Sequence, residues 1–406
     1  MTLRRRAIAL LMLAGLPAVT YYLWACLTYA DGAFAAPRLL LDALRAAAPT
    51  ATAVALYFAW LLLQAVLQLA APGTMREGTP LADGSRLSYQ LNGWFTFWAT
   101  WIVVLAAAGI GWIAPGVAYD QFLPLLTTAN LTAFALAAFL FWWGARTPDP
   151  GRTGDPLDDY LMGVALNPRV GRLDLKFFCE SRPGLILWVV INASLAAKQY
   201  ELFGHVTVPM LLVNVFQFLY VADYFFNEEA IVTTWDIKHE RFGWMLCWGD
   251  LVWVPFTYTI QAYYLVTHPH SLPTLATIGI VALNMTGYVV FRLSNIQKHR
   301  FRTNPARPVW GRPAEYIRTK SGALLLTSGW WGIARHLNYF GDLLMGLAWC
   351  LPTGFSRPVP YFYIVYFCIL LLHRERRDYH MCERKYGADW EAYCRKVPWR
   401  IIPGVY

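Results

Sequence analysis

The chain has 406 residues, of which 57% are hydrophobic and only 15% are charged. Soluble domains of this size carry about a quarter charged residues, so this composition argues against an ordinary soluble enzyme and predicts an all-α, polytopic membrane protein. The net charge of +9 would suit a nucleic-acid-binding protein, but the positions of the basic residues along the chain give another explanation.

Ten apolar runs are long enough to cross a bilayer, by the criterion of about 20 residues for each span. The ninth run contains polar residues and could be broken into two segments, and the last run is short. The sequence therefore predicts about ten transmembrane helices, at 7–27, 50–72, 94–115, 122–144, 184–203, 206–226, 243–266, 272–293, 324–350 and 359–373.

The basic residues support this topology. If both termini are cytoplasmic, 29 of the 34 lysines and arginines lie on the cytoplasmic side or at its edge. The five others are Arg38, Arg45 and Arg357 in opposite loops, and Lys198 and Arg335 within spans. An excess of basic residues in cytoplasmic loops is the usual pattern of membrane proteins. It accounts for the net charge without nucleic acid as a partner.

A polar stretch, Gly329 to Asp342, lies inside the ninth apolar run. Within it, Trp330 and Trp331 offer flat rings, Arg335 offers a fixed cation and Asn338 offers an amide. Polar groups at membrane depth are costly to desolvate and usually mark a site that faces a cavity. We therefore expect this stretch to bind a polar ligand.

Two further groups of polar residues lie near the cytoplasmic side. Lys298 and Arg302 are one helical turn apart at the end of the eighth span, which suits either an orienting basic cluster or a phosphate clamp. In the tail, four residues recur at intervals of four and predict one stripe on a helix, although such a stripe is commonly just a solvated face. These residues are Arg374, Asp378, Cys382 and Tyr386.

Acidic and phenolic groups also lie in or near the sixth span. Tyr220 and Asp223 are three residues apart, and Glu228 follows shortly after. A carboxyl or phenol in an apolar site can act as a proton donor, but a hydrogen-bonded structural network explains any one of them equally well. The seven cysteines have no metal-ligand spacing, so no metal site is predicted.

Several of these motifs together resemble the sterol reductases of the Δ14/Δ7/C24 group. The resemblance runs from about residue 55 to the end and is carried by GSRLSYQLNG at 84–93, NPRVG at 167–171, LLLTSGWWG at 324–332, RHLNYFGD at 335–342, HRERRD at 373–378 and KYG at 385–387. AAKQ at 196–199 and PYFYI at 360–364 look most like the 7-dehydrocholesterol reductase branch.

The resemblance implies a single membrane domain in which residues 1–290 form the sterol-side helices and residues 291–406 hold NADPH. The implied cofactor-binding residues are Lys298, Arg302, Leu326, Trp331, Arg335, Asn338, Tyr339, Arg374, Asp378, Cys382 and Tyr386.

The expected reaction is reduction of a sterol ring double bond, and the branch resemblance favours the C7–C8 bond. Such a reduction requires a proton and a hydride. Tyr220 is the predicted proton donor, supported by Asp378, Asp223 or Glu228. Δ14- or C24-sterol reduction is the alternative within the group.

Two other classes of protein remain open at this point. One is a membrane methyltransferase of the isoprenylcysteine type, which would use S-adenosylmethionine and has a similar C-terminal outline. The other is a non-catalytic sterol-binding protein. The expected location is the endoplasmic reticulum membrane, or the cytoplasmic membrane of a bacterium, with a sterol and the bilayer as partners. The sequence does not indicate an oligomeric state.

Overall fold

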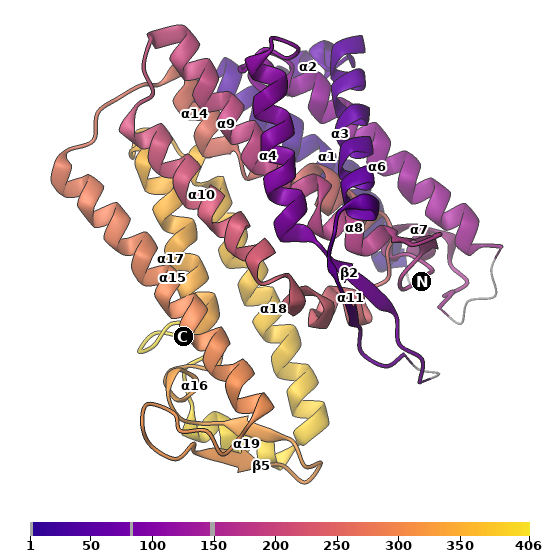
Figure 1. Cartoon of the computed structure of the whole chain (residues 1–406), viewed down its shortest axis with the longest axis vertical. Coiled ribbons are helices and arrows are strands. Elements are labelled where there is room, and N and C mark those ends of the chain that lie inside the picture. The colour runs from indigo at the N-terminus through magenta and orange to yellow at the C-terminus, as the bar shows by residue number, and fades with distance from the viewer. Residues whose placement is uncertain (1–2, 82–83, 147–150) are drawn as a thin grey trace. The chain divides into compact units, whose positions relative to one another are not determined.

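The computed structural model describes residues 3–81, 84–146 and 151–406, and most of them are helical (Figure 1). The chain divides into two compact units. Unit 1 comprises the chain up to His270 together with Arg357–Val359, and unit 2 comprises Ser271–Ser356 and Pro360–Tyr406.

Unit 1 is built mainly of helices, with two short antiparallel hairpins on its loops. In the hairpins Thr74 pairs with Leu91, and Arg169 pairs with Asp174. The elements are α1 (Leu3–Tyr29), α2 (Pro37–Ala46), α3 (Ala51–Ala70), β1 (Thr74–Glu77), β2 (Ser88–Leu91), α4 (Gly93–Gly109), α5 (Val117–Asp120), α6 (Phe122–Gly144), α7 (Pro156–Met162), β3 (Arg169–Val170), β4 (Leu173–Asp174), α8 (Leu175–Ser181), α9 (Pro183–Phe203), α10 (Val208–Phe226), η1 (Glu228–Thr233), α11 (Trp235–His239), α12 (Trp244–Trp248), η2 (Gly249–Trp253), α13 (Val254–Thr257) and α14 (Ile260–Thr267).

Unit 2 contains the longest helix of the described chain, one hairpin and the C-terminal helices. In the hairpin Tyr316 pairs with Leu326. The elements are α15 (Thr274–Thr303), β5 (Tyr316–Arg318), β6 (Leu324–Leu326), α16 (Trp330–Ile333), α17 (Leu337–Cys350), η3 (Leu351–Thr353), α18 (Phe362–Tyr386) and α19 (Ala388–Lys396), with η4 (Val359–Tyr361) at the boundary between the units.

Five described helices are long and apolar enough to cross a membrane: α1, α3, α6, α10 and α15. The structure thus supports a mostly helical membrane protein, and the prediction of ten spans stays a prediction. The seventh predicted span is not one regular α-helix. A π-helical turn, η2, joins α12 to α13, and a turn at Tyr258 and Thr259 separates α13 from α14. Helix α9 packs closely there: a Cβ on Gly184 would lie 1.9 Å from the backbone oxygen of Asp250.

The ninth apolar run, 324–350, is not one helix. Its first residues form β6 and the short helix α16, and only the part from Leu337 onward is the long helix α17. Gly329 explains part of the break, since its φ of +64° belongs to a region that other residues rarely adopt. Arg335 and His336 therefore lie between α16 and α17, whereas Asn338 and Asp342 belong to the first turns of α17. The run is divided, as its polar residues allowed.

Helices α15 and α17 approach each other through two glycines (Figure 1). A Cβ on Gly287 would lie 2.7 Å from the backbone oxygen of Gly341, and a Cβ on Gly341 would lie 2.5 Å from the backbone nitrogen of Phe291. Small residues allow such close packing between membrane helices. The contact places the end of α15 beside the start of α17, where the polar stretch lies.

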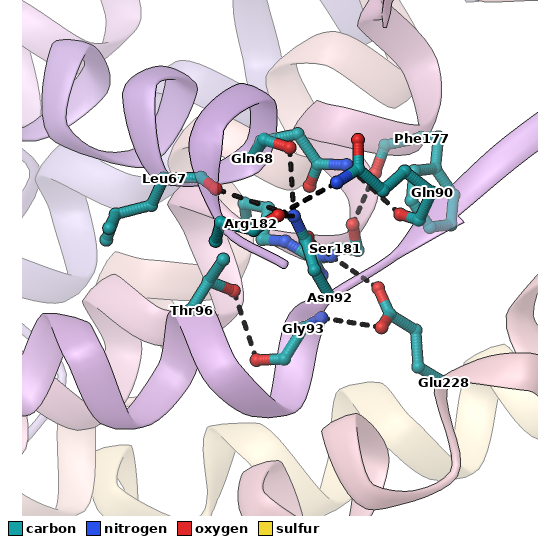
Figure 2. A network of polar contacts seen from close by, with 11 residues as sticks. Leu67, Gln68, Gln90, Asn92, Gly93, Thr96, Phe177, Ser181, Arg182 and Glu228 are labelled. Carbon is teal, nitrogen blue, oxygen red and sulfur yellow. Dashed lines mark hydrogen bonds and ion pairs between the residues drawn. The ribbon is translucent and has the colours of Figure 1, made fainter. Parts of the chain in front are cut away.

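A buried polar network joins four segments of unit 1, and Figure 2 shows it. Arg182, fully buried, forms an ion pair with Glu228 and donates to Asn92 Oδ1 at 3.0 Å. Glu228 Oε2 in turn accepts from the backbone N–H of Gly93 at 2.6 Å. Since Gly93 begins α4, the carboxylate satisfies one of the N–H groups that a helix start leaves without a partner.

The same network closes the end of α3. Asn92 Nδ2 donates to the backbone oxygens of Gln68 at 2.9 Å and Ala71 at 3.2 Å, and Gln90 Nε2 donates to Ala71 at 2.8 Å. The carbonyl groups at a helix C-terminus have no partner within the helix, and the side-chain amides of Asn92 and Gln90 donate hydrogen bonds to them. The network therefore fixes the ends of α3 and α4 relative to Arg182, which precedes α9.

Candidate functional site

All of the residues predicted to bind a cofactor lie in unit 2. At the end of α15, Lys298 places its Nζ 3.6 Å from the centre of the Trp331 ring, within range of a cation–π contact. Trp331 is 3% exposed, and its Nε1 donates to the backbone oxygen of Ser294 at 2.8 Å. The ring is thus fixed between α15 and the loop. Arg302 follows Lys298 by one turn of the same helix.

The loop before α17 is held by the end of the chain. The backbone N–H groups of Arg335 and His336 donate to the backbone oxygens of Trp399 at 2.9 Å and Arg400 at 2.8 Å. Arg400 is anchored by the buried carboxylate of Glu375, at 3.1 Å. Two residues far from the polar stretch in sequence therefore set the position of its backbone.

Arg335 is only 5% exposed, which is unusual for a guanidinium group. Its Nη1 donates to the Sγ atom of Cys394, and its guanidinium carbon lies 5.7 Å from the centre of the Tyr379 ring. Its Nε is buried and has no hydrogen-bond partner among the described residues. A buried cation with an unused donor can accept an anionic or carbonyl oxygen of a ligand.

Asp378 on α18 faces the same loop. Its Oδ2 lies 3.4 Å from His336 Nε2. Burial acts to raise the pKa of Asp378, but the hydrogen bond from His336 and the nearby charges of Lys298 and Arg302 outweigh it and lower the pKa below its ordinary value. At neutral pH the carboxylate is ionised and accepts hydrogen bonds. This state favours an orienting role over proton donation by Asp378.

Asn338 and Tyr339 begin α17 beside these groups. Asn338 Nδ2 donates to Asn295 Oδ1 at 3.4 Å, and the Oδ1 of Asn338 is buried without a hydrogen-bond partner in the described chain. The Tyr339 ring stacks on His336 with centroids 4.8 Å apart and an angle of 15°. The Asn338 oxygen, in the first turn of α17, is thus a second unused polar atom beside Arg335 and His336.

The other predicted cofactor residues surround this loop. Leu326 packs in an apolar cluster with Phe301, Val309 and Trp331. Cys382 and Tyr386 pack against the cluster formed by Trp390, Tyr393 and Val397. Arg374 lies on an exposed part of α18, and α18 carries the whole predicted stripe from Arg374 to Tyr386. Helix α18 ends at Tyr386 and Gly387 follows it. Trp390 and Tyr393 therefore belong to a separate helix, α19, whereas the sequence analysis treated them as part of the same helix.

The predicted proton donors fall into two groups. Asp378 belongs to unit 2, whereas Tyr220, Asp223 and Glu228 belong to unit 1. The Tyr220 ring lies on α10 with its centre 6.2 Å from that of Trp188. Asp223 Oδ1 accepts from Asn227 Nδ2 at 3.3 Å, and Glu228 is the partner of Arg182. Glu228 therefore already has a structural use, whereas the chemical role of Tyr220 stays a prediction.

Several residues of the site were not predicted individually. His336 contacts Asp378, Cys394 accepts from Arg335, and the backbone oxygen of Arg400 accepts from His336. Of these, only His336 lay inside a motif that the sequence singled out. Cys394 and Arg400 lie some 60 residues further along the chain. No local pattern marks them, because their contacts depend on how α19 and the C-terminal segment pack against the loop.

A pyridine dinucleotide phosphate suits this group of residues. The basic side chains Lys298, Arg302 and Arg335 match its phosphates, the rings of Trp331 and Tyr339 offer flat surfaces, and the unused Asn338 oxygen can accept from a carboxamide. The unpartnered Arg335 and Asn338 atoms are the structural observation that favours a bound polar ligand here.

The family model for the ergosterol biosynthesis ERG4/ERG24 family matches residues 3–406. The chain belongs to this family of sterol reductases. A Delta(14)-sterol reductase of Methylotuvimicrobium alcaliphilum is 58% identical over 98% of this chain and 94% of its own length. A Delta(14)-sterol reductase of Dictyostelium discoideum is 46% identical over 96% and 88%, and one of mouse is 45% identical over 87% and 85%.

Membership of the family confirms the resemblance drawn from the sequence motifs. These relatives carry the name Delta(14)-sterol reductase, so they support the alternative interpretation better than the C7–C8 interpretation. The family match also removes the support for a methyltransferase, since the match covers nearly the whole chain.

Proposed function

We propose that this protein reduces the Δ14 double bond of a sterol, with NADPH as the reductant. The observation that carries the proposal is the 58% identity, over almost the full length of both chains, to a protein named Delta(14)-sterol reductase. The sequence motifs that favoured the C7–C8 bond, such as AAKQ and PYFYI, are short. Full-length likeness outweighs such short segments.

NADPH would be held by the loop and helix ends of unit 2. When bound, it supplies the hydride that completes the reduction. Lys298, Arg302 and Arg335 would bind phosphate oxygens through charge-assisted hydrogen bonds. Asn338 would orient the nicotinamide carboxamide. The ionised Asp378 would hold the His336 ring, which stacks on the ring of Tyr339. Leu326, Trp331, Arg374, Cys382 and Tyr386 would complete the surroundings of the cofactor.

The proton requires a separate donor. Protonation of the double bond gives a carbocation, which the hydride then neutralises, so one proton and one hydride are added in total. A phenol or a protonated carboxyl in an apolar environment can supply that proton. We assign this role to Tyr220 because Asp378 is held in its ionised form and Glu228 is engaged by Arg182.

Substrate identity can be tested with the purified protein in lipid nanodiscs and NADPH. We expect a sterol with a conjugated 8,14-diene to gain two hydrogens by mass and to lose its diene absorbance. 7-Dehydrocholesterol and a Δ24 sterol are run in parallel. Reduction of 7-dehydrocholesterol alone would overturn the Δ14 assignment, and no reduction of any of the three would overturn the reductase function in favour of a binding protein.

Substitution of Tyr220 tests the proton donor. Tyr220→Phe removes the hydroxyl and keeps the ring, so we expect turnover to fall by at least about a hundredfold, the usual contribution of a general acid. NADPH affinity, measured by fluorescence titration, should stay unchanged. Tyr224→Phe on the same helix is the matched control. Near-normal turnover of Tyr220→Phe would exclude the phenol and leave Asp223 as the next candidate.

We further propose that the protein functions in a cytoplasmic or endoplasmic reticulum membrane with both termini on the cytoplasmic side. The apolar helices and the distribution of basic residues support this orientation. The substrate would reach the protein from the bilayer.

A further inference from the structure

A small pocket lies at the polar end of α15, and none of the candidate cofactor residues lines it. Its volume is about 260 Å³, and it is bounded by α15, by the loop after it and by the start of α16. The residues that matter for its chemistry are Gln297, Arg300, Phe301, Arg307, Trp310 and Trp330. Drug-sized ligands occupy sites of roughly 300–1,000 Å³, so this pocket suits only a compact group.

The pocket shares a wall with the candidate cofactor residues, because Phe301 and Val309 pack with Leu326 and Trp331, but its cation on α15 points elsewhere. Arg300 lines the pocket, whereas Lys298, two positions earlier, stacks on Trp331. Residues two positions apart on a helix differ by about 200° in direction, so the side chains of Lys298 and Arg300 point to nearly opposite sides. The two adjacent tryptophans also take different places: Trp331 contacts Lys298, and Trp330 lines the pocket.

The wall formed by Trp310 is held in an uncommon backbone conformation. Trp310 has a φ of +51°, and such a conformation costs a bulky residue of the order of 1 kcal/mol or more. Val309 and Arg312 close the turn by two backbone hydrogen bonds of 2.8 and 3.1 Å. The Trp310 ring meets Trp330 edge to face, with centroids 5.5 Å apart, although Trp310 is 60% exposed.

The opposite wall is also fixed. Gln297 Oε1 accepts from the backbone N–H of Trp330 at 2.8 Å, and a Cβ on the neighbouring Gly329 would lie 2.4 Å from Gln297 Nε2. The glutamine therefore links α15 to the start of α16. The pocket is built from anchored residues, with Arg300 and Arg307 as exposed cations at its edge.

The length of α15 places this pocket at the level of lipid headgroups. The helix has 30 residues and is one of the candidate spans, so it is about 45 Å long, whereas the hydrocarbon core is about 30 Å thick. Its polar C-terminal turns, which carry Gln297 and Arg300, extend beyond the apolar part. Tryptophan and arginine are the residues expected where a span meets the headgroup layer.

We propose that this pocket binds the phosphodiester headgroup of an anionic phospholipid. Arg300 and Arg307 would hold the phosphate oxygens, and Trp310 and Trp330 would contact the glycerol and the first carbons of the acyl chains. Basic pockets beside membrane helices recognise anionic lipids in this manner. The exposed Leu293, one or two turns toward the membrane, continues the apolar surface along which a chain would run.

The test uses the full-length protein purified in a neutral detergent and measures retained lipid by native mass spectrometry. Phosphatidylglycerol and phosphatidylcholine of the same chain length are added separately. We expect the wild type to retain phosphatidylglycerol preferentially. Arg300→Gln/Arg307→Gln should weaken that retention roughly thirtyfold, since each arginine near anionic lipid contributes a factor of about five, and should leave phosphatidylcholine retention unchanged.

Arg318→Gln/Arg384→Gln is the matched control, because it removes the same charge from exposed positions outside the pocket. An equal loss of phosphatidylglycerol in this control would show that net charge alone attracts the lipid and would overturn the pocket. Displacement of the lipid by millimolar inorganic phosphate would overturn the lipid assignment and make the site one for soluble phosphate. Lipid retention does not depend on turnover, so failure of the proposed reductase activity would leave this test intact.

Discussion

Arg335 shows how a single polar residue within an apolar run is accommodated. The guanidinium is buried, one end donates to Cys394, and the backbone is paired with Trp399. Its Nε remains without a partner in the described residues, which is costly unless a ligand supplies one. The residue is therefore positioned by contacts that leave one donor available, as a binding residue requires.

The Asp378–His336 contact gives a dependence of stability on pH. Because the pKa of Asp378 is lowered below its ordinary value of about 3.8, this carboxylate stabilises the folded protein above that value. The contribution is lost as the pH falls through the lowered pKa. We expect Asp378→Asn to lower the thermal unfolding midpoint at pH 7, and the difference from wild type to shrink as the pH approaches about 3.

The measurement is a series of thermal unfolding curves between pH 7 and pH 3 in the same detergent. Glu383→Gln, an exposed substitution on the same helix, controls for loss of one carboxyl group. A difference between wild type and Asp378→Asn that stays constant over this range would contradict the assignment of an ionised, hydrogen-bonded Asp378.

At the scale of elements, the packing of α15 on α17 decides whether the candidate cofactor residues meet. Asn338 and Tyr339 begin α17, and Lys298 and Arg302 lie near the end of α15. The two helices can approach because Gly287 and Gly341 face each other's backbone. The geometry of the site thus depends on glycines that are not among the candidate cofactor residues.

Two alanine substitutions on α15 test this packing. Gly287→Ala would bring a methyl group within 2.7 Å of a backbone oxygen and 2.9 Å of Met345, so we expect a loss of about 1–3 kcal/mol in stability. NADPH affinity should fall as well. Gly279→Ala on the same helix meets no atom within 4 Å and should be neutral or slightly stabilising. Unfolding midpoints and cofactor titration check both variants, and equal behaviour of the two would contradict the close approach.

At the scale of the whole molecule, the candidate residues belong to two compact units. The cofactor residues fall in unit 2, and Tyr220, Asp223 and Glu228 fall in unit 1. The sequence-based division into residues 1–290 and 291–406 stays a prediction of function, while the contacts of the fold separate near His270. Within unit 1, the network around Arg182 connects α3, α4, η1 and the start of α9.

Breaking this network should destabilise unit 1 strongly. Arg182→Met would leave the buried Glu228 carboxylate without its cation, which costs about 3–5 kcal/mol. Arg182→Met/Glu228→Gln removes the unpaired charge and keeps an oxygen for the Gly93 N–H, so it should recover part of the loss. Thermal unfolding of both variants in detergent measures the difference. A double variant no more stable than Arg182→Met would show that the charge pair is not the main contribution.

The sequence by itself determined most of the local structure and the family. Long apolar runs predict helices, because backbone N–H and C=O groups in the bilayer core must pair within the segment. The stripe from Arg374 to Tyr386 does lie on one helix. Motifs such as RHLNYFGD are short and continuous, so they were sufficient to indicate a sterol reductase. The few segments that distinguish the branches favoured 7-dehydrocholesterol reductase, whereas the full-length relatives carry the name Delta(14)-sterol reductase.

The tertiary structure alone decided which distant residues act together. Arg182 meets Asn92 across 90 positions and Arg335 meets Cys394 across 59, and Trp310 meets Trp330 through a turn held at positive φ. Periodicity describes only neighbours along one element, whereas these contacts arise when separate elements pack. The same packing holds the polar stretch, which comprises α16, a short link and the start of α17, by contacts with α15 and with the C-terminal segment.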